Sequence, residues 1–249
     1  MDGDSPLRCD LSALQGATII RPAGVLSIQT YPLLRDAMLK CAADQPRAVI
    51  VDLDALEITH DYLISVFVTV WMRVSAWSAV SLVVVPGPAH AAAFDHGPAH
   101  RFLTVRSTVL DALEQLEEPA PRQRTELWLP PSALSVRAAQ RFVTDTCDNW
   151  KVDTLTPHAV AVASELVANT ARHTTSPARL RLELRRRRLT VAVADDDPRP
   201  VALPHPAGDL AEPRGGLHLV TQLAHASGCS RRQSGGKVVW AVLRIPSNP

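Results

Sequence analysis

The sequence predicts two domains of different fold class, an α/β domain over residues 10–117 and an α+β sandwich over residues 127–246. In the first, short apolar runs alternate with helical patterns, as in α/β domains. In the second, successive helical patterns precede alternating strands, which is typical of helices on one face of an antiparallel sheet. Residues 118–126 between them are charged and contain two prolines, without apolar periodicity, as expected of a linker.

Apolar periodicity predicts the individual elements. In the first domain we expect strands at Ala17–Ile20, Ala48–Leu53 and Ser81–Val85, and helices at Thr30–Ala43 and Thr108–Leu116. In the second we expect helices at Ser132–Asn149, Thr156–His173 and Gly216–Ala226, and strands at Arg179–Leu184, Thr190–Ala194 and Lys237–Ile245. The arginines at 185–188 lie between alternating segments, which favours a hairpin turn over a polyanion-binding arm.

Composition and charge exclude several classes of function. The formal net charge of +1 provides no basic face for direct nucleic-acid binding. No run approaches the ~18–20 apolar residues that a membrane-spanning helix needs, and the acidic N-terminal segment lacks the apolar core of a signal peptide. The four cysteines are scattered without a CxxC pair, which disfavours a zinc site and favours the reducing cytoplasm.

A polar stripe runs along the predicted helix Thr156–His173. Glu165, Asn169 and His173 recur at four-residue spacing and therefore share one face. A carboxylate and a carboxamide one turn apart can provide a proton acceptor and a Mg²⁺ ligand beside a phosphate, since Mg²⁺ takes oxygen ligands and keeps several waters. Taken alone, such a stripe is more often a solvated helix face.

Two further features follow in the chain. Asp195 ends a predicted strand, where a carboxylate can accept a hydrogen bond from an exocyclic amine such as that of adenine. Gly215 and Gly216 open a predicted helix, where exposed backbone N–H groups form an anion site. Each alone is more commonly a solvated acidic turn or a simple glycine turn.

In this order, the segments resemble the GHKL ATPase superfamily, and most closely the anti-sigma-factor serine kinases. The resemblance spans about Leu127 to Ile245 and rests on the segments Glu165–His173 (Glu-Leu-x-x-Asn-x-x-x-His), Val193–Asp195, Arg214–Val220 and Gly235–Trp240 (Gly-Gly-Lys-x-x-Trp). The resemblance implies ATP and Mg²⁺ as cofactors. It implies that Glu165 is the general base acting on a partner's serine, that Asn169 binds Mg²⁺ and that Asp195 reads adenine. It also implies that Gly215 and Gly216 cover the phosphates, which Arg172 approaches.

The sequence departs from this family in the glycine-rich motif and the last strand. Arg214 replaces the first glycine of the motif Gly-Arg-Gly-Leu, and Gly215 replaces its arginine. Val238 and Val239 stand where a hydroxyl residue near adenine is common. Neither change removes the base Glu165 or the magnesium ligand Asn169, so ATP binding is expected, whereas turnover depends on Glu165 acting beside an altered glycine-rich motif.

The first domain resembles the STAS domain of anti-sigma-factor antagonists, through the stretch Val49–Ile58. In that family the strand leads to Asp-Ser-Ser-Gly at a helix start, where a serine receives the kinase's phosphate. This sequence has Tyr62 at the acceptor position, and Ser65, one turn later, is expected as a hydrogen-bonded hydroxyl in or near the core. We therefore expect a degenerate STAS-like domain without a phosphoacceptor serine.

Two functions from different classes remain. The first is a cytoplasmic, partner-switching protein-serine/threonine kinase that acts on a separate STAS-domain antagonist, a sigma factor, or both. The alternative is a non-catalytic, ATP-dependent protein-interaction switch. A sensor histidine kinase is disfavoured because the segment between linker and ATP motifs is only one helix long. The oligomeric state, a homodimer included, is left open.

Overall fold

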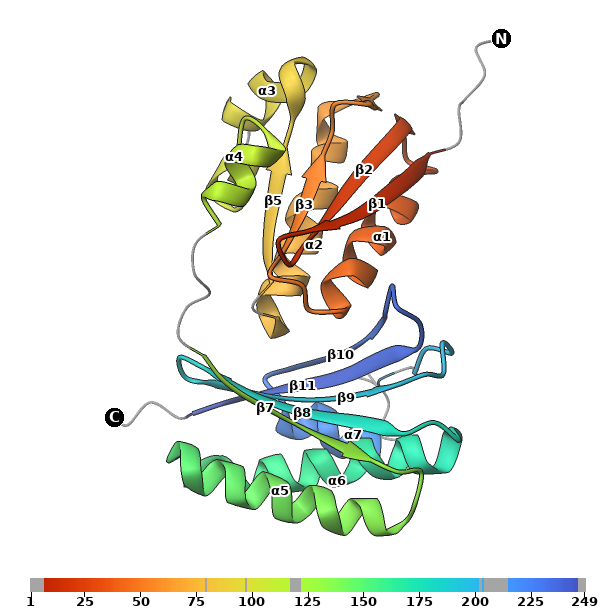
Figure 1. Cartoon of the computed structure of the whole chain (residues 1–249), viewed down its shortest axis with the longest axis vertical. Coiled ribbons are helices and arrows are strands. Elements are labelled where there is room, and N and C mark those ends of the chain that lie inside the picture. The colour runs from red at the N-terminus through yellow and green to blue at the C-terminus, as the bar shows by residue number, and fades with distance from the viewer. Residues whose placement is uncertain are drawn as a thin grey trace. The chain divides into compact units, whose positions relative to one another are not determined.

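The computed structural model describes residues 7–78, 80–96, 98–116, 122–201, 203 and 215–245. The chain divides into two compact units, Met1–Pro119 and Ala120–Pro249 (Figure 1). The first unit has a largely parallel sheet and the second an antiparallel one, so the predicted α/β and α+β classes are confirmed. The finer domain boundaries stay a prediction.

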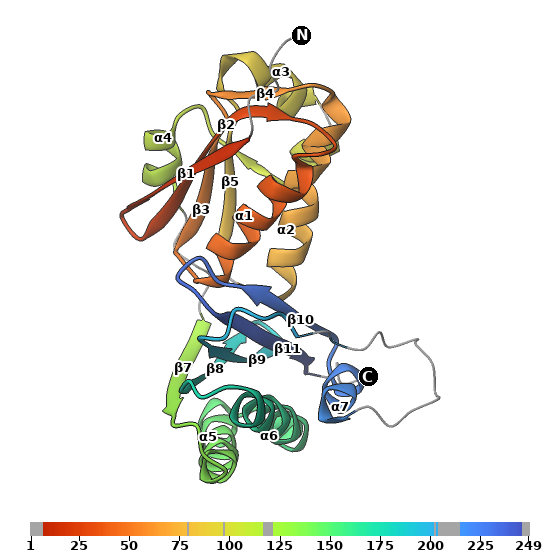
Figure 2. The same cartoon turned by 90° about the vertical axis from the view of Figure 1, so that its right-hand side faces the viewer.

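The first unit is a sheet covered by helices on both faces (Figure 2). Its strands are β1 (Arg8–Leu14), β2 (Ala17–Leu26), β3 (Ala48–Asp52), β4 (Leu56–Ile58), β5 (Ser81–Val85) and β6 (Thr104–Val105), in the order β1-β2-β3-β5-β6 with β4 beside β2. Its helices are α1 (Tyr31–Ala43), α2 (Ser65–Trp77), α3 (Gly87–His96) and α4 (Val109–Glu114), with 3-10 turns η1 (Asp61–Ile64) and η2 (Pro98–Arg101). β1 and β2 are antiparallel, and the pairs from β2 to β6 are parallel.

Strand β3 explains why this sequence forms a two-faced sheet. Val49 and Val51 join the core beneath α1 and α2, whereas Ala48 and Ile50 pack against α4 on the other face. A parallel strand buried on both sides needs apolar residues at successive positions rather than at alternate ones. The nearly all-apolar run of the sequence therefore predicted its position correctly.

The second unit places its helices on one face of an antiparallel sheet (Figure 2). Its elements are β7 (Arg122–Leu129), α5 (Leu134–Trp150), η3 (Asp153–Leu155), α6 (Thr156–His173), β8 (Ala178–Arg185), β9 (Arg188–Asp195), α7 (Gly215–Leu223), β10 (Ala226–Arg231) and β11 (Lys237–Arg244), with strand order β10-β11-β9-β8-β7. Alternate residues of β8, β9 and β11 pack with the inner faces of α5 and α6 to form the core. The predicted arginine turn is confirmed, since Arg186 links β8 and β9 with φ of 53°.

Two strands of this unit escaped prediction. Strand β7 begins at Arg122, inside the segment expected as a linker, and pairs with β8 along its whole length. Strand β10 begins at Ala226, so the predicted helix Gly216–Ala226 is too long and α7 ends at Leu223. Both strands are rich in charged or small residues, and pairing with a neighbouring strand outweighs their weak intrinsic preference.

No helix in the described part of the chain is long and apolar enough to cross a membrane.

Candidate functional site

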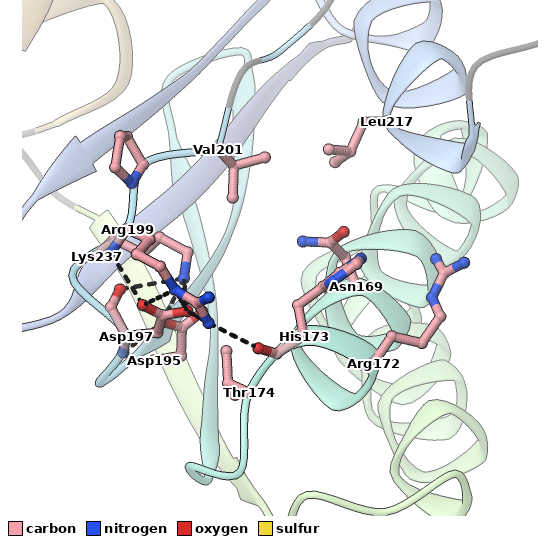
Figure 3. Close-up of a pocket in the computed structure, with 11 residues that line it drawn as sticks. Asn169, Arg172, His173, Thr174, Asp195, Asp197, Arg199, Val201, Leu217 and Lys237 are labelled. Carbon is pink, nitrogen blue, oxygen red and sulfur yellow. Dashed lines mark hydrogen bonds and ion pairs between the residues drawn. The ribbon is translucent and has the colours of Figure 1, made fainter.

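A pocket of about 500 Å³ opens in the second unit, between the last turns of α6, the end of β9 and the starts of α7 and β11 (Figure 3). This volume is within the range typical of small-molecule sites, about 300–1,000 Å³. Polar and charged side chains dominate its lining, with a few apolar ones: Asn169, Arg172, His173, Thr174, Asp195, Asp197, Arg199, Pro200, Val201, Leu217 and Lys237.

Helix α6 presents Asn169, Arg172 and His173 to this pocket because its other side is fixed in the core. The buried side of the helix includes Leu166 and Val167, and Thr170 extends that side toward β9. The neighbouring positions in the last turn are therefore left to face the cavity. Figure 3 shows Asn169 on the α6 side of the pocket, across from Asp195 and Lys237.

The opposite wall is built around a buried ion pair between Asp195 and Lys237. The register of β9 and β11 places these two residues directly opposite each other, both facing the helices. The Lys237 ammonium donates to Oδ1 of Asp195 at 2.8 Å, and both side chains are almost fully buried. It also donates to the Asp197 carbonyl oxygen at 3.1 Å. Burying two charges is costly unless hydrogen bonds satisfy them, and the additional contacts do so here.

Two further groups hold the Asp195 carboxylate. The backbone N–H of Asp197 donates to Oδ1 at 3.0 Å. The Thr170 hydroxyl lies 3.4 Å from Oδ2 and 3.2 Å from the Leu166 carbonyl oxygen. Asp195 is thus anchored from its own loop, from β11 and from α6, which gives this carboxylate a fixed orientation.

Asp197 and Arg199 form a second ion pair at the rim of the pocket. The Arg199 guanidinium donates to both carboxylate oxygens of Asp197 at 2.8–3.0 Å, and its Nη2 lies 3.4 Å from the His173 carbonyl oxygen. These Arg199 hydrogen bonds lower the pKa of Asp197 well below its usual value. The Arg199 side chain is 78% exposed, so solvent screens the pair and its contribution to stability is small.

Glu165 lies beside the pocket rather than in its lining. Its carboxylate is partly exposed, and Oε2 is 3.8 Å from Nη2 of Arg172. The first turn of α7 rests against it: a Cβ placed on Gly216 would meet Oε2 at 1.4 Å. The lack of a side chain at Gly216 therefore lets the helix start lie directly against the Glu165 carboxylate in this orientation.

A second close approach occurs at the turn before β11. Gly236 has φ of +73°, and a Cβ there would lie 2.0 Å from the Asp195 carbonyl oxygen and 2.7 Å from Cα of Asp196. Only glycine fits this combination of left-handed backbone and contact with another backbone. The turn thus supports the loop that carries Asp195 and positions Lys237 next to it.

The structure brings together most, but not all, of the predicted site residues. Asn169, Arg172 and Asp195 line one pocket, whereas Glu165 and Gly216 contact each other beside it. Gly215 is the first residue of α7, and Arg214 lies outside the described residues. His173, the third residue of the predicted polar stripe, is exposed and lines the pocket.

Sequence reasoning missed Thr170 and Arg199, and it named Lys237 only as part of the Gly-Gly-Lys motif, without a role in the site. A signal for Lys237 was present, because it is a charged residue at the start of the otherwise apolar run Val238–Leu243. Its partner lies 42 residues earlier in the chain, so only strand register reveals the pair.

Metal-binding side chains are sparse around the site. In the described residues, no group of three or more His, Cys, Asp or Glu side chains could hold a metal ion. The donor set fits Mg²⁺ held by one amide oxygen, phosphate oxygens and water better than a cage built from protein alone. Asn169 is the residue in the pocket that can supply such an amide oxygen.

In the first unit, Tyr62 and Ser65 lie near the expected phosphoacceptor position. Tyr62 is in η1, is 58% exposed and has its ring centroid 5.3 Å from that of His60. Ser65 is the first residue of α2 and is exposed, so its expected place in the core is wrong. The reason is geometric: α2 buries Val66 and Phe67, which leaves Ser65 on the solvent side.

Comparison with known families agrees with the architecture of the second unit. Residues 129–243 match the family model described as histidine kinase-like ATPase domain. The resemblance to an ATP-binding domain of this kind that the sequence predicted for this segment is thus confirmed. A comparison with curated proteins returned no match.

Solved structures that match the N-terminal part of the chain are anti-sigma-factor antagonists. An anti-sigma factor antagonist from Mycobacterium paratuberculosis is 20% identical, covers 47% of this chain and 98% of its own, and has a TM-score of 0.40. A STAS domain protein from Planctomyces limnophilus is 19% identical, with 44% and 97% covered and a TM-score of 0.35. Unphosphorylated SpoIIAA is 15% identical, with 44% and 96% covered and a TM-score of 0.33.

Proposed function

We propose that this protein binds ATP and Mg²⁺ in the pocket of its second unit and acts as a cytoplasmic, partner-switching regulatory kinase. The observation that carries the proposal is the arrangement of Asn169, Arg172 and Asp195 around one pocket of a histidine kinase-like ATPase domain. Asn169 and Arg172 come from α6 and Asp195 from the end of β9, and each of these two features alone has a simpler explanation.

The chemistry of the lining supports a nucleotide as the ligand. Asp195 offers a carboxylate acceptor to an exocyclic amine, and Val201 and Leu217 offer apolar contact to a base. Arg172 carries positive charge suited to phosphates, and Gly215 and Gly216 open α7, whose N-terminus favours anions. Asn169 would supply an oxygen to Mg²⁺, which when bound neutralises phosphate charge.

Glu165 is the proposed general base, which would accept the proton of a partner's serine hydroxyl. A positioned base typically contributes about 10²–10⁴-fold in rate. The Glu165 side chain is 30% exposed, which leaves the carboxylate accessible to a partner, and Nη2 of Arg172 lies 3.8 Å from its Oε2. The remaining rate enhancement would come from positioning and charge neutralisation.

The proposed substrate is a serine on a separate STAS-domain antagonist, and a sigma factor is a second possible partner. Tyr62 occupies the acceptor position of the first unit, and its longer aromatic side chain does not suit a serine kinase. Ser65 is exposed, so self-transfer to this residue is tested separately with Ser65→Ala.

Calorimetric titration with ATP, with and without Mg²⁺, tests the nucleotide site first. We expect saturable binding that is tighter with Mg²⁺, and no binding would contradict the proposal as a whole. Labelled ATP and purified STAS-domain proteins then test the kinase activity. Binding of ATP without transfer to any of these proteins counts against catalysis alone.

A second candidate is a non-catalytic switch, in which ATP occupancy changes a protein–protein interaction. Two observations favour it: Glu165 lies outside the pocket lining, and the glycine-rich motif is altered at Arg214 and Gly215. Glu165→Ala separates the candidates. Loss of regulation by this variant supports the kinase, and unchanged regulation supports the switch.

A further inference from the structure

The hydrogen bonds of Asp195 distinguish its two carboxylate oxygens. Oδ1 accepts from the Lys237 ammonium at 2.8 Å and from the Asp197 N–H at 3.0 Å. A carboxylate oxygen has two lone-pair directions, so Oδ1 has no room for another donor. Oδ2 is approached only by the Thr170 hydroxyl, at 3.4 Å, among the contacts of the described residues. Oδ2 therefore keeps a free lone pair.

Lys237 itself has little freedom to move. Its side chain is 3% exposed, and its ammonium donates to the Asp197 carbonyl oxygen at 3.1 Å and lies 3.7 Å from Oδ2 of the Asp197 carboxylate. The register of β9 and β11 places it opposite Asp195. A fixed donor on one side of the carboxylate means that the other side is always the one available to a ligand.

We propose that Lys237 is a positioning residue that makes Oδ2 of Asp195 the base-reading atom and thereby selects 6-amino over 6-oxo purines. The inference rests on the proposed nucleotide binding in this pocket. A 6-amino group donates to a free carboxylate oxygen, whereas a 6-oxo group presents an acceptor to an acceptor. Because two acceptors cannot form a hydrogen bond, a bound 6-oxo purine would leave a buried polar group without a partner, which weakens binding.

Replacing Asp195 with asparagine gives a sharp test, because a carboxamide has one acceptor end and one donor end. Lys237 and the Asp197 N–H both donate toward the Oδ1 position, so the carboxamide oxygen must lie there. Its NH₂ group then occupies the Oδ2 position and offers a donor to the ligand. Asp195→Asn should therefore reverse the base preference from 6-amino to 6-oxo.

The experiment measures dissociation constants of ATP and ITP for the full chain with Mg²⁺. ITP differs from ATP at the 6-position and the adjacent N1 proton only. The wild type should bind ATP tighter than ITP by about tenfold or more, as expected for one hydrogen bond to a charged group. Asp195→Asn should bind ITP tighter than ATP. Asp195→Asn/Lys237→Met should bring the ratio of the two constants toward one, because the carboxamide can then turn.

The double variant is the control for folding, because it removes both charges of the buried pair together. Thermal unfolding without nucleotide checks that each protein is folded. A structural defect alone weakens ATP and ITP together and leaves their ratio unchanged. A ratio in Asp195→Asn that still favours ATP, or equal ratios in the single and double variants, overturns the role of Lys237. If the wild type binds neither nucleotide, the proposed function fails as well.

Discussion

The α-carbon of Gly216 lies so close to the Glu165 carboxylate that a Cβ on Gly216 would be 1.4 Å from Oε2. The contact joins the start of α7 to α6 across 51 positions of the chain (216 − 165). The atoms in the way are the end of a flexible side chain, so an alanine could be accommodated if Glu165 turned aside. Glycine at position 216 is thus needed to keep the Glu165 side chain in place rather than to keep the protein folded.

Gly216→Ala is therefore expected to have little effect on stability in the wild type and to stabilise the protein in a Glu165→Ala background. Alanine in a helix gains up to about 1 kcal/mol over glycine, and in the wild type the displacement of Glu165 offsets this gain. Thermal unfolding of the four proteins of this double-mutant cycle measures the coupling. Equal effects of Gly216→Ala in both backgrounds would show that the two residues do not interact.

Asn169→Ala is expected to remove most of the gain in ATP affinity that Mg²⁺ provides, with little change in affinity without the metal. The expected loss is at least about tenfold, the lower end of what changes near a metal site cost. Asn149→Ala is a matched control, because Asn149 is exposed on α5 and does not line the pocket. Calorimetry with and without Mg²⁺ gives two ATP dissociation constants for each of the three proteins. An unchanged Mg²⁺ effect in Asn169→Ala would exclude this residue as the ligand.

The two glycines before β11 allow the stability cost of backbone strain alone to be compared with the cost of strain plus a steric clash. Gly235 and Gly236 both have positive φ, but a Cβ on Gly235 meets nothing within 4 Å, whereas one on Gly236 meets Asp195 backbone at 2.0 Å. Gly235→Ala should cost only backbone strain, about 1–3 kcal/mol. Gly236→Ala should cost more and also weaken ATP binding, since it displaces the Asp195 loop. Urea unfolding and ATP titration check both, and equal losses would refute the steric argument.

The Asp197–Arg199 pair predicts a dependence of stability on pH. Arg199 lowers the pKa of Asp197 in the folded state. The stabilisation of the folded state by this pair is therefore fully present above the unfolded-state pKa of Asp197, about 4. It is lost as pH falls through the lower pKa of Asp197 in the folded state. The difference in urea midpoint between wild type and Arg199→Ala should be largest near pH 7 and shrink below about pH 4. In an Asp197→Asn background, Arg199→Ala should show no such pH dependence; a dependence that persists there would assign it to other groups.

Much of the second unit could be predicted because its signals are local. The spacing of Glu165 and Asn169 within one helix, and the position of Asp195 at a strand end, are both visible within about ten residues. The helix Thr156–His173 was predicted with the bounds that the structure has. Strands β7 and β10 were not, because their charged or small residues lack apolar alternation and they form only by pairing with β8 and β11.

The sequence by itself determined the two fold classes and the order of Asn169, Asp195 and Gly216. The reason is that apolar periodicity, and the residues that begin or end helices and strands, are visible among neighbours in the chain. Only the tertiary structure decided that Lys237 faces Asp195 and that Gly216 touches Glu165. The physical reason is that strand register and helix packing join segments far apart in the chain, and a shift of one residue in β11 would turn Lys237 to the other face of the sheet.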